Sequence, residues 1–316
     1  MEERGGKGFR SGMPQALALV ILGVLLAFGG DPFPLLNARA FLLPITAVLL
    51  PVTVWWWWKG RKALAVGAFV AALLTALPTA RFLVDRPGKP SGTEFLRVAL
   101  LNVHEDNDAY AEVVAVARST GADVLAVLET DDRWYQDLVA ALGDQYPWHV
   151  HGGGERFYGI ALFSRVPVRN ADVVSLDGLP SIRASITTPS GPLILFAVHL
   201  RAPESAAKTA QRNRQWRMLE TWVSEEAGPV CVVGDLNTVP WDRSFRNFIG
   251  ATGVDGGRDI LRPTWPTYAG ACLVPLDHLL AGHGAQVGAT HLLDIPGSDH
   301  LGKTVTLRTA GQQAPG

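Results

Sequence analysis

Three long apolar stretches occupy most of the N-terminal part of the chain and restrict its fold more than any other feature. They cover about residues 14–30, 41–58 and 63–84. Each approaches the roughly 20 residues with which a helix crosses a bilayer, although the first two are slightly short. Four consecutive tryptophans at 55–58 are typical of a membrane interface, where aromatic and basic side chains anchor a helix end. We therefore expect a membrane anchor with three transmembrane helices over residues 1–84.

Basic residues around these stretches predict how the anchor is oriented. The N-terminal tail carries three basic residues, the first loop carries only Arg39, and the second loop again carries three. Because basic loops stay in the cytoplasm, we expect the tail and the second loop there. An odd number of spans then leaves the C-terminal domain outside the cell membrane.

A cleaved signal peptide is the competing interpretation of the N-terminus, because Ala38–Arg39–Ala40 resembles a cleavage site. This segment lies about ten residues beyond the first apolar core, and two more apolar stretches follow it. We therefore favour a retained, multi-pass anchor in the cell membrane with a cytoplasmic N-terminus.

The rest of the chain is typical of a soluble α/β domain. Residues 85–93 are rich in proline, glycine and charge and are expected to form a linker. Residues 94–316 contain no repeat or internal boundary, and strands alternate with few helices, which favours two packed sheets with helices on their outer faces. We predict strands at 95–103, 123–128, 158–164, 182–188, 192–199, 229–234, 274–280 and 304–308. We predict helices at 108–120, 131–142, 204–227 and 241–250.

Polar residues follow or interrupt several apolar, strand-like runs of this domain. The tetrapeptide Gly-Asp-Leu-Asn at 234–237 comes directly after the apolar run 230–233, and Ser-Asp-His at 298–300 places a carboxylate beside an imidazole. Polar groups in such places cost free energy unless they have partners, so we expect them to form one site. Three further residues occupy similar positions upstream: Asn102, Glu129 and His199.

These residue types indicate metal-assisted hydrolysis of a phosphate ester or anhydride. Asn102 and Glu129 are oxygen donors suited to a hard divalent cation such as Mg²⁺, which would offset charge on a phosphoryl group. Asp235 can orient the attacking water or accept its proton, and Asn237 can fix the position of Asp235 by a neutral hydrogen bond. Neither a serine nor a cysteine nucleophile is required.

Histidines could complete such a site. His199 and His300 could donate hydrogen bonds to phosphoryl oxygens. A carboxylate such as Asp277 could keep His300 charged and oriented.

The charge of the domain gives no indication of a broad basic surface. From Ser91 onward there are 18 Lys and Arg against 25 Asp and Glu, a formal balance of −7. Proteins that bind nucleic acid without sequence specificity usually carry a basic stripe, so nucleic acid is not favoured as a partner. Cys231 and Cys272 could form a disulfide in an exported domain, but two separate buried thiols are slightly favoured.

The ordered set of motifs resembles the endonuclease/exonuclease/phosphatase superfamily over roughly residues 95–310. The set consists of Asn102, Glu129, the segment Gly-Ile-Ala-Leu-Phe-Ser-Arg at 159–165, His199, the motif at 234–237, Asp277-His278 and the motif at 298–300. The resemblance implies a four-layered α/β sandwich and Mg²⁺-dependent hydrolysis of phosphoesters, with Mn²⁺ as the expected substitute.

The resemblance also implies a role for each matching residue. Glu129 is implied to be the principal metal ligand, helped by Asn102 and more loosely by Asp299. Asp235 and Asn237 are implied to position the water. Asp277 is implied to be the partner of His300, and His199 is implied to bind the scissile phosphate.

One departure from the family pattern is His104, because several members carry a carboxylate at this position, two residues after the first asparagine. It weakens the expectation of a second metal ion and leaves His104 as either a substrate contact or a histidine at a strand end. His149 and His151 precede a run of three glycines, where we expect a surface loop rather than a metal site.

The apolar N-terminus joined to such a domain resembles one branch of the superfamily more closely, the membrane-anchored teicoplanin-resistance proteins. The run 234–241, followed by Phe245 and Arg246, also resembles that branch. The resemblance implies an extracytoplasmic phosphatase that acts on undecaprenyl pyrophosphate, a lipid pyrophosphate of cell-wall synthesis. A tether would raise the effective concentration of such a lipid at the site. Two alternatives stay open: an anchored nuclease or other phosphodiesterase of the same fold, and a non-catalytic protein that binds a cell-wall precursor.

Overall fold

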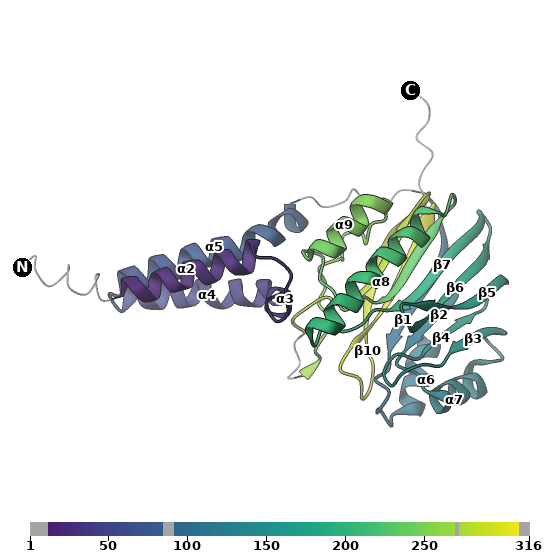
Figure 1. The fold of residues 1–316 in the computed structure, drawn as a ribbon. Helices are drawn as coiled ribbons and strands as arrows, with labels where there is room; N and C mark the ends of the chain where they lie inside the picture. The colour runs from purple at the N-terminus through teal and green to yellow at the C-terminus, as the bar shows by residue number, and fades with distance from the viewer. Residues whose placement is uncertain (1–11, 85–91, 269–271, 310–316) are drawn as a thin grey trace, which may run out of the picture. The chain divides into compact units, whose positions relative to one another are not determined.

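The computed structural model describes residues 12–84, 92–268 and 272–309. The chain forms two compact units, one built mainly from residues before 87 and the other mainly from residues after it. Figure 1 shows a helical N-terminal unit and a unit that combines strands and helices.

The N-terminal unit consists of helices that correspond to the three apolar stretches, with one short helix between two of them. The helices are α2 (Met13–Phe28), α3 (Leu35–Ala40), α4 (Leu42–Trp58) and α5 (Lys62–Val84). Glycines allow α2 and α5 to approach closely: a β-carbon on Gly67 would lie 2.8 Å from the Cα atom of Ala16. The hydroxyl groups of Thr46 and Thr75 form a hydrogen bond of 2.8 Å between α4 and α5.

Only one of these helices is long enough by itself to qualify as a membrane span. Within the described residues, the stretch Lys62–Ala80 of α5 has the required length and hydropathy, whereas α2 and α4 are shorter apolar helices. The three apolar stretches are therefore helical as expected, and their crossing of a bilayer stays a prediction.

The second unit contains two sheets that pack face to face. The six-stranded sheet has the order β10-β11-β1-β2-β4-β3, and the five-stranded sheet has the order β5-β6-β7-β8-β9. The strands of the first sheet are β1 (Glu94–Asn102), β2 (Val124–Leu128), β3 (Trp148–Gly152), β4 (Ile160–Ser164), β10 (Ala285–Asp294) and β11 (Leu301–Thr309). The strands of the second sheet are β5 (Val168–Leu176), β6 (Leu179–Thr188), β7 (Gly191–His199), β8 (Val230–Asp235) and β9 (Asp277–Gly282).

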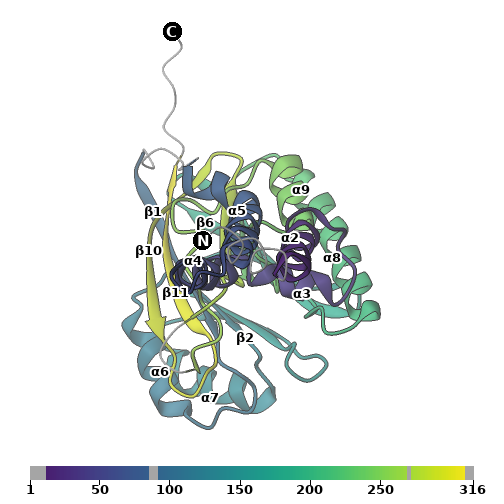
Figure 2. The ribbon, with the colours of Figure 1, turned by 90° about the vertical axis from the view of Figure 1, so that its left-hand side faces the viewer.

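Helices cover the outer faces of both sheets. They are α6 (Tyr110–Ser119), α7 (Asp132–Leu142), α8 (Ala206–Ser224) and α9 (Arg243–Thr252). Figure 2 shows α8 and α9 on one side of the sandwich and α6 and α7 on the other. One apolar core fills the space between the sheets, a second lies under α6 and α7, and a third lies under α8 and α9. The predicted four-layered α/β sandwich is therefore confirmed.

The pairing of the strands places the ends of several of them at one edge of the sandwich. In the first sheet, β1 and β2 are parallel, and Asn102 is opposite Leu128. In the second sheet, β7 and β8 are parallel, with His199 opposite Asp235. The antiparallel partner β9 places Asp277 on the other side of Asp235.

Some local predictions need correction. The predicted strands and helices all occur with shifted ends, but β3, β5 and β10 were not predicted. The expected loop around His149 and His151 is the edge strand β3, in which Nδ1 of His149 lies 2.7 Å from the Tyr135 hydroxyl group. Because an edge strand buries little surface, it can carry polar residues and lacks the apolar pattern by which strands are predicted. Both cysteines are unpaired thiols, Cys231 being buried and Cys272 partly exposed.

Candidate active site

The end of the parallel pair β1–β2 brings together an amide and a carboxylate. Asn102 is the last residue of β1, and Glu129 directly follows β2. The Nδ2 group of Asn102 donates a hydrogen bond of 2.8 Å to Oε1 of Glu129. Glu129 has a φ of +59°, a left-handed conformation that is unusual for a residue with a β-carbon. Such strain is concentrated at functional sites in proteins.

Asp235 is the centre of the polar cluster on the second sheet. Its Oδ1 atom accepts a hydrogen bond of 2.8 Å from the backbone N–H of Asn237. Its Oδ2 atom lies 3.6 Å from Nε2 of His199 and 3.7 Å from Nε2 of His300. The side chain of Asn237 donates to the Leu200 carbonyl at 2.9 Å and lies 3.3 Å from Nε2 of His199.

Contacts between the two sheets join these groups into one site. The Nδ2 atom of Asn102 lies 3.5 Å from Oδ2 of Asp235. His300 comes from the segment before β11 in the first sheet, and its Nδ1 atom lies 2.8 Å from Oδ2 of Asp277 in the second.

Asp299 reaches the same site from beside His300. Its Oδ2 atom accepts a hydrogen bond of 2.9 Å from the indole N–H of Trp265, and its Oδ1 atom lies 3.6 Å from Nδ1 of His104. The structure thus brings together all eight residues that the sequence singled out. They are Asn102, Glu129, His199, Asp235, Asn237, Asp277, Asp299 and His300.

His104 lies beside the site, two residues after the end of β1, and its role as a substrate contact stays a prediction. Its Nδ1 atom is 3.6 Å from Oε2 of Glu129, and its ring stacks on Phe157 at 5.8 Å. The side chain is about one-third exposed. His104 is therefore partly exposed beside the carboxylates of Glu129 and Asp299, where a substrate could contact it.

Sequence reasoning missed several residues that support the site. The hydroxyl group of Thr264 accepts a hydrogen bond from the backbone N–H of Asp277 at 3.2 Å, and Nζ of Lys303 donates to the Asp277 carbonyl at 2.7 Å. The ring of Tyr158 packs 4.7 Å from that of His199. For Lys303, the available signal was a charged residue near the start of a strand that is otherwise mainly apolar and threonine-rich, although Arg308 near its other end is charged too.

The two central histidines have opposite electrostatic behaviour. Burial alone would lower the pKa of His300, but the charge and hydrogen bond of Asp277 outweigh it and raise the pKa to about 10. For His199, burial dominates and lowers the pKa to about 4. His300 is therefore charged near neutral pH, whereas His199 is neutral.

The carboxylates also differ. Burial and the neighbouring Asp277 raise the pKa of Asp235 well above its usual range. Burial opposes ionisation of Glu129 too, but its side-chain interaction with His104 and the hydrogen bond from Asn102 help to offset it, and its pKa is lowered. The pKa of Asp277 is lowered because His300 outweighs the effect of burial. Their surroundings therefore stabilise the ionised form of Glu129 and Asp277 and increase the affinity of the Asp235 carboxylate for a proton.

The donor atoms fit a divalent cation. Oxygen or nitrogen atoms of Glu129, Asp235 and His300 lie within 4.8 Å of one another, and all three residues are buried. A protonated His300 cannot ligate a metal, so the oxygen donors are the better ligands. Glu129 offers carboxylate oxygen atoms of the kind that hard cations prefer. Asn102 turns its Nδ2 group toward Glu129 and Asp235, while its Oδ1 atom accepts a hydrogen bond from the N–H group of His104 at 3.2 Å. Asp299 lies outside the group of three buried residues. The expected roles of Asn102 and Asp299 as metal ligands therefore stay predictions.

Comparisons with known proteins agree with this geometry. Residues 99–300 match the model of the Endonuclease/Exonuclease/phosphatase family. A search of curated protein sequences finds no match.

Solved structures show the same fold at low sequence identity. One is an endonuclease/exonuclease/phosphatase from Beutenbergia cavernae, with 21% identity and a TM-score of 0.55 over 69% of this chain and 72% of that one. Another is D. rerio TDP2 complexed with a single-strand DNA product, with 19% identity and a TM-score of 0.58 over 69% of this chain and 100% of that one.

A third is a 3′ phosphatase, NExo, from Neisseria bound to a product DNA hairpin. It has 15% identity and a TM-score of 0.54 over 66% of this chain and 98% of that one. The family match spans most of the second unit and includes both motifs that meet at Asp235. This chain therefore belongs to the endonuclease/exonuclease/phosphatase family, whose members hydrolyse phosphoesters.

Proposed function

We propose that this protein is a membrane-anchored, extracytoplasmic, Mg²⁺-dependent phosphatase that hydrolyses a lipid pyrophosphate, undecaprenyl pyrophosphate. In this role it would recycle the lipid carrier of cell-wall synthesis and contribute to resistance against glycopeptides such as teicoplanin. The observation that carries the proposal is that one chain combines the site around Asp235 with a unit of apolar helices.

The surface of the helical unit supports a membrane location. Large apolar side chains are exposed along α2, α4 and α5, including Leu17, Val54 at 68% and Trp58 at 79%. Exposed apolar surface of this extent is costly in water and is favourable in a bilayer. The ammonium group of Lys62 lies 3.6 Å from the ring centre of Trp57, a pairing suited to the interface.

The orientation of the anchor supports a lipid substrate on the outer face. The basic residues of the tail and of the loop at 59–62 favour a cytoplasmic location for these segments, and an odd number of crossings would then leave the second unit outside. A tethered site gains effective concentration toward a lipid headgroup, whereas a nuclease acting on free DNA gains little. The resemblance of the run 234–241 to the branch of teicoplanin-resistance proteins that includes VanJ supports the same substrate.

The residues of the site have complementary tasks in this reaction. Mg²⁺ bound by Glu129, Asn102 and Asp299 would neutralise charge on the phosphoryl oxygens. The Asp235 carboxylate, fixed by the backbone of Asn237, orients the attacking water and receives its proton. His300 donates a hydrogen bond to the phosphoryl group, which gains charge in the transition state. The neutral His199 contacts the scissile phosphate from the other side of Asp235.

An anchored nuclease is the second candidate. Two structures with this fold are described as bound to DNA products, those of D. rerio TDP2 and Neisseria NExo. The acidic balance of the domain opposes this candidate, because binding to DNA depends on the neutralisation of phosphates.

Phosphate release by the purified, detergent-solubilised full chain tests the proposal. Undecaprenyl pyrophosphate and DNA would be compared with Mg²⁺, with Mn²⁺ and with EDTA. The Asp235→Ala variant serves as the inactive control, and Asp172→Ala, at an exposed position of β5, serves as the matched control.

Metal-dependent release from the lipid alone, lost in Asp235→Ala and kept in Asp172→Ala, is the expected result. Hydrolysis of DNA alone would reject the cell-wall function and keep the reaction class. Binding of the lipid without turnover of either substrate would favour a non-catalytic binding protein.

A further inference from the structure

The backbone of Asp277 is held by two side chains at the outer side of its sheet. Asp277 begins β9, which is the last strand of the five-stranded sheet and has no neighbouring strand beyond it among the described residues. The N–H group of Asp277 donates to the hydroxyl group of Thr264 at 3.2 Å. Its carbonyl oxygen accepts a hydrogen bond of 2.7 Å from Nζ of Lys303. These side chains occupy the place that another strand would take.

Lys303 reaches Asp277 from the opposite sheet. It lies on β11, three residues after His300, whose Nδ1 atom is 2.8 Å from Oδ2 of Asp277. One short segment of the first sheet therefore holds Asp277 at two points, the carboxylate through His300 and the main chain through Lys303. The other carboxylate oxygen, Oδ1, is buried and has no hydrogen-bond partner in the part of the chain that the structure describes. Lys303 and His300 thus hold Asp277 from the first sheet, and Thr264 holds it as well.

The burial of Lys303 is expensive, which indicates that its contact serves something other than packing. Only 3% of the residue is exposed, and burial lowers its pKa to about 8. An apolar side chain of similar length could occupy this strand position without the cost of desolvating an ammonium group. Within residues 12–84, 92–268 and 272–309, the Asp277 carbonyl is the one hydrogen-bond acceptor of Lys303.

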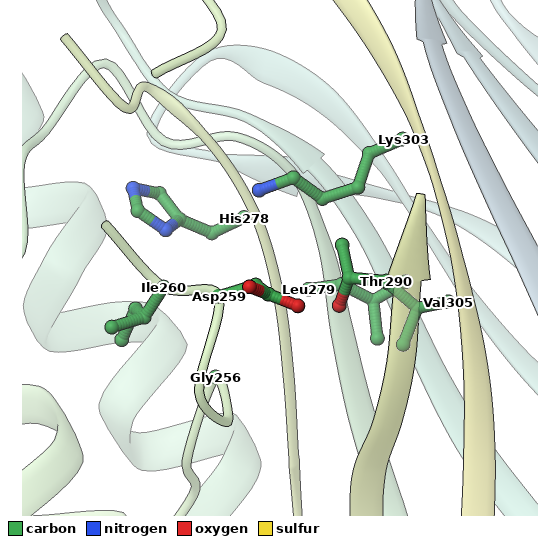
Figure 3. A pocket seen from close by; sticks show the side chains of 8 residues that line it. All are labelled: Gly256, Asp259, Ile260, His278, Leu279, Thr290, Lys303 and Val305. Carbon is green, nitrogen blue, oxygen red and sulfur yellow. The ribbon is translucent and has the colours of Figure 1, made fainter. Parts of the chain in front are cut away.

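The other charged groups around Lys303 do not replace this contact. Figure 3 shows Lys303, Asp259 and His278 around one small pocket. Asp259 attracts the ammonium group from a distance, and Arg262, which pairs with Asp259 at 3.5 Å, opposes that attraction. His278 is occupied by the carbonyl groups of Thr238 and Pro275. The Asp277 carbonyl is thus the direct polar partner of Lys303.

We propose that Lys303 is a positioning residue for the hydrolytic reaction. It fixes the start of β9 so that the Asp277 carboxylate holds His300 with its Nε2 atom toward Asp235. Lys303 acts through Asp277 and does not touch the substrate. The kinetic part of this inference rests on the proposed phosphatase function.

The kinetic test compares Lys303→Met, Lys303→Arg and the control Arg308→Met in the full chain. Lys303→Met keeps the length of the side chain and removes its donor, and Arg308→Met removes a charge from a more exposed position of the same strand. We expect Lys303→Met to lower kcat about tenfold to a hundredfold with KM unchanged, as for other residues that orient a catalytic group. Lys303→Arg should recover part of the loss, because it retains a charged donor. Arg308→Met should behave as wild type.

A double-mutant cycle separates positioning from a general structural effect. In an Asp277→Asn background, Lys303→Met should cause little further loss of kcat, because Lys303 is proposed to act through the Asp277 carboxylate and its contact with His300. Additive losses would overturn the proposal. So would wild-type kcat in Lys303→Met, or an equal loss in Arg308→Met.

A measurement without substrate keeps this inference separate from the proposed function. The proton shared between His300 Nδ1 and Asp277 should give a low-field proton NMR resonance, identified by its absence in His300→Gln. In Lys303→Met this resonance should shift or broaden, whereas in Arg308→Met it should stay unchanged. An unchanged resonance in Lys303→Met would reject the positioning role, whether or not the chain hydrolyses the lipid. A chain without phosphatase activity in which the resonance responds would reject the proposed function and retain the contact.

Discussion

The carboxylate of Asp277 lies 2.8 Å from Nδ1 of His300, and this contact joins the edge strand of one sheet to the segment that enters the other. Because the pair is buried, the charge on each partner depends on the other. The Nε2 atom of His300 then lies 3.7 Å from Asp235. The pair therefore presents a fixed positive charge to the residue that we assign to the attacking water.

The first prediction concerns pH. With Asp277 present, the pKa of His300 is raised to about 10, so the charged form should persist through the neutral range and support activity into alkaline solution. Asp277→Asn removes the charge that offsets burial, so His300 should lose its proton at lower pH. We expect the alkaline limit of kcat/KM to move down in the variant and kcat to fall about 10²-fold or more. A pH profile of phosphate release measures both effects, and an unchanged alkaline limit would contradict this role of Asp277.

The same pair has a consequence for stability with a definite sign. A folded-state pKa above the usual value of 6.5 means that His300 stabilises the folded chain fully below pH 6.5. This contribution should be lost as the pH rises from there through about 10. Thermal unfolding of wild type and Asp277→Asn across this range should therefore converge at high pH.

The second prediction separates the metal ligand from the group that acts on water. Glu129→Ala should weaken Mg²⁺ binding and abolish turnover, because its ionised carboxylate is the principal ligand. Asp235→Ala should reduce kcat about 10²- to 10⁴-fold and leave Mg²⁺ affinity near that of wild type. Calorimetric titration with Mg²⁺, beside phosphate release, distinguishes the two. Equal Mg²⁺ affinities in the two variants would contradict these assignments.

The residues of the site could be predicted because strand ends carry a strong local signal. Asn102 and Asp235 each end a buried strand, and Glu129 directly follows one. A polar side chain at such a position either has partners in a site or costs free energy by being buried without them. Lys303 gave no comparable signal. Its partner is 26 positions away in the chain and belongs to the other sheet, so only the packing of the two sheets reveals the contact.

The strands that could not be predicted share one property, because all three lie at sheet edges. β3 and β10 end the six-stranded sheet on its two sides, and β5 ends the five-stranded sheet. Central strands such as β2 and β8 are buried along their whole length and appear as continuous apolar runs. Edge strands carry exposed polar residues, as β5 does over most of its length, and therefore resemble loops in the sequence.

The third prediction concerns the glycine before Asp235. A β-carbon on Gly234 would lie 1.8 Å from the carbonyl oxygen of Val198 on the neighbouring strand, so Gly234→Ala should force β7 and β8 apart. We expect a loss of about 1–3 kcal/mol in unfolding free energy, with a loss of turnover because Asp235 is displaced. Gly228→Ala is the matched control, since a β-carbon added there would meet no atom within 4 Å. Thermal unfolding and phosphate release of both variants test this prediction, and tolerance of Gly234→Ala would contradict the tight strand contact.

The fourth prediction concerns the orientation of the anchor, on which the choice of a lipid substrate depends. An alkaline phosphatase reporter, which becomes active only after export, should be active when fused after Gly316. The same reporter fused after Gly60, in the basic second loop, should be silent, because that loop is expected in the cytoplasm. The pair of fusions matters because a single active fusion could also arise from a cleaved signal peptide with no membrane crossing after it, which would leave both positions outside.

Activity at both positions would therefore contradict the three-span anchor, although the domain would still be exported. The argument that a membrane tether favours a lipid substrate would then no longer hold. Silence at both positions would place the site of Asp235 in the cytoplasm, away from the outer leaflet on which the lipid pyrophosphate is proposed to be hydrolysed. An active fusion after Gly316 with a silent one after Gly60 is the combination that three spans with a cytoplasmic N-terminus predict. It would bring the catalytic unit and its proposed substrate to the same side of the membrane.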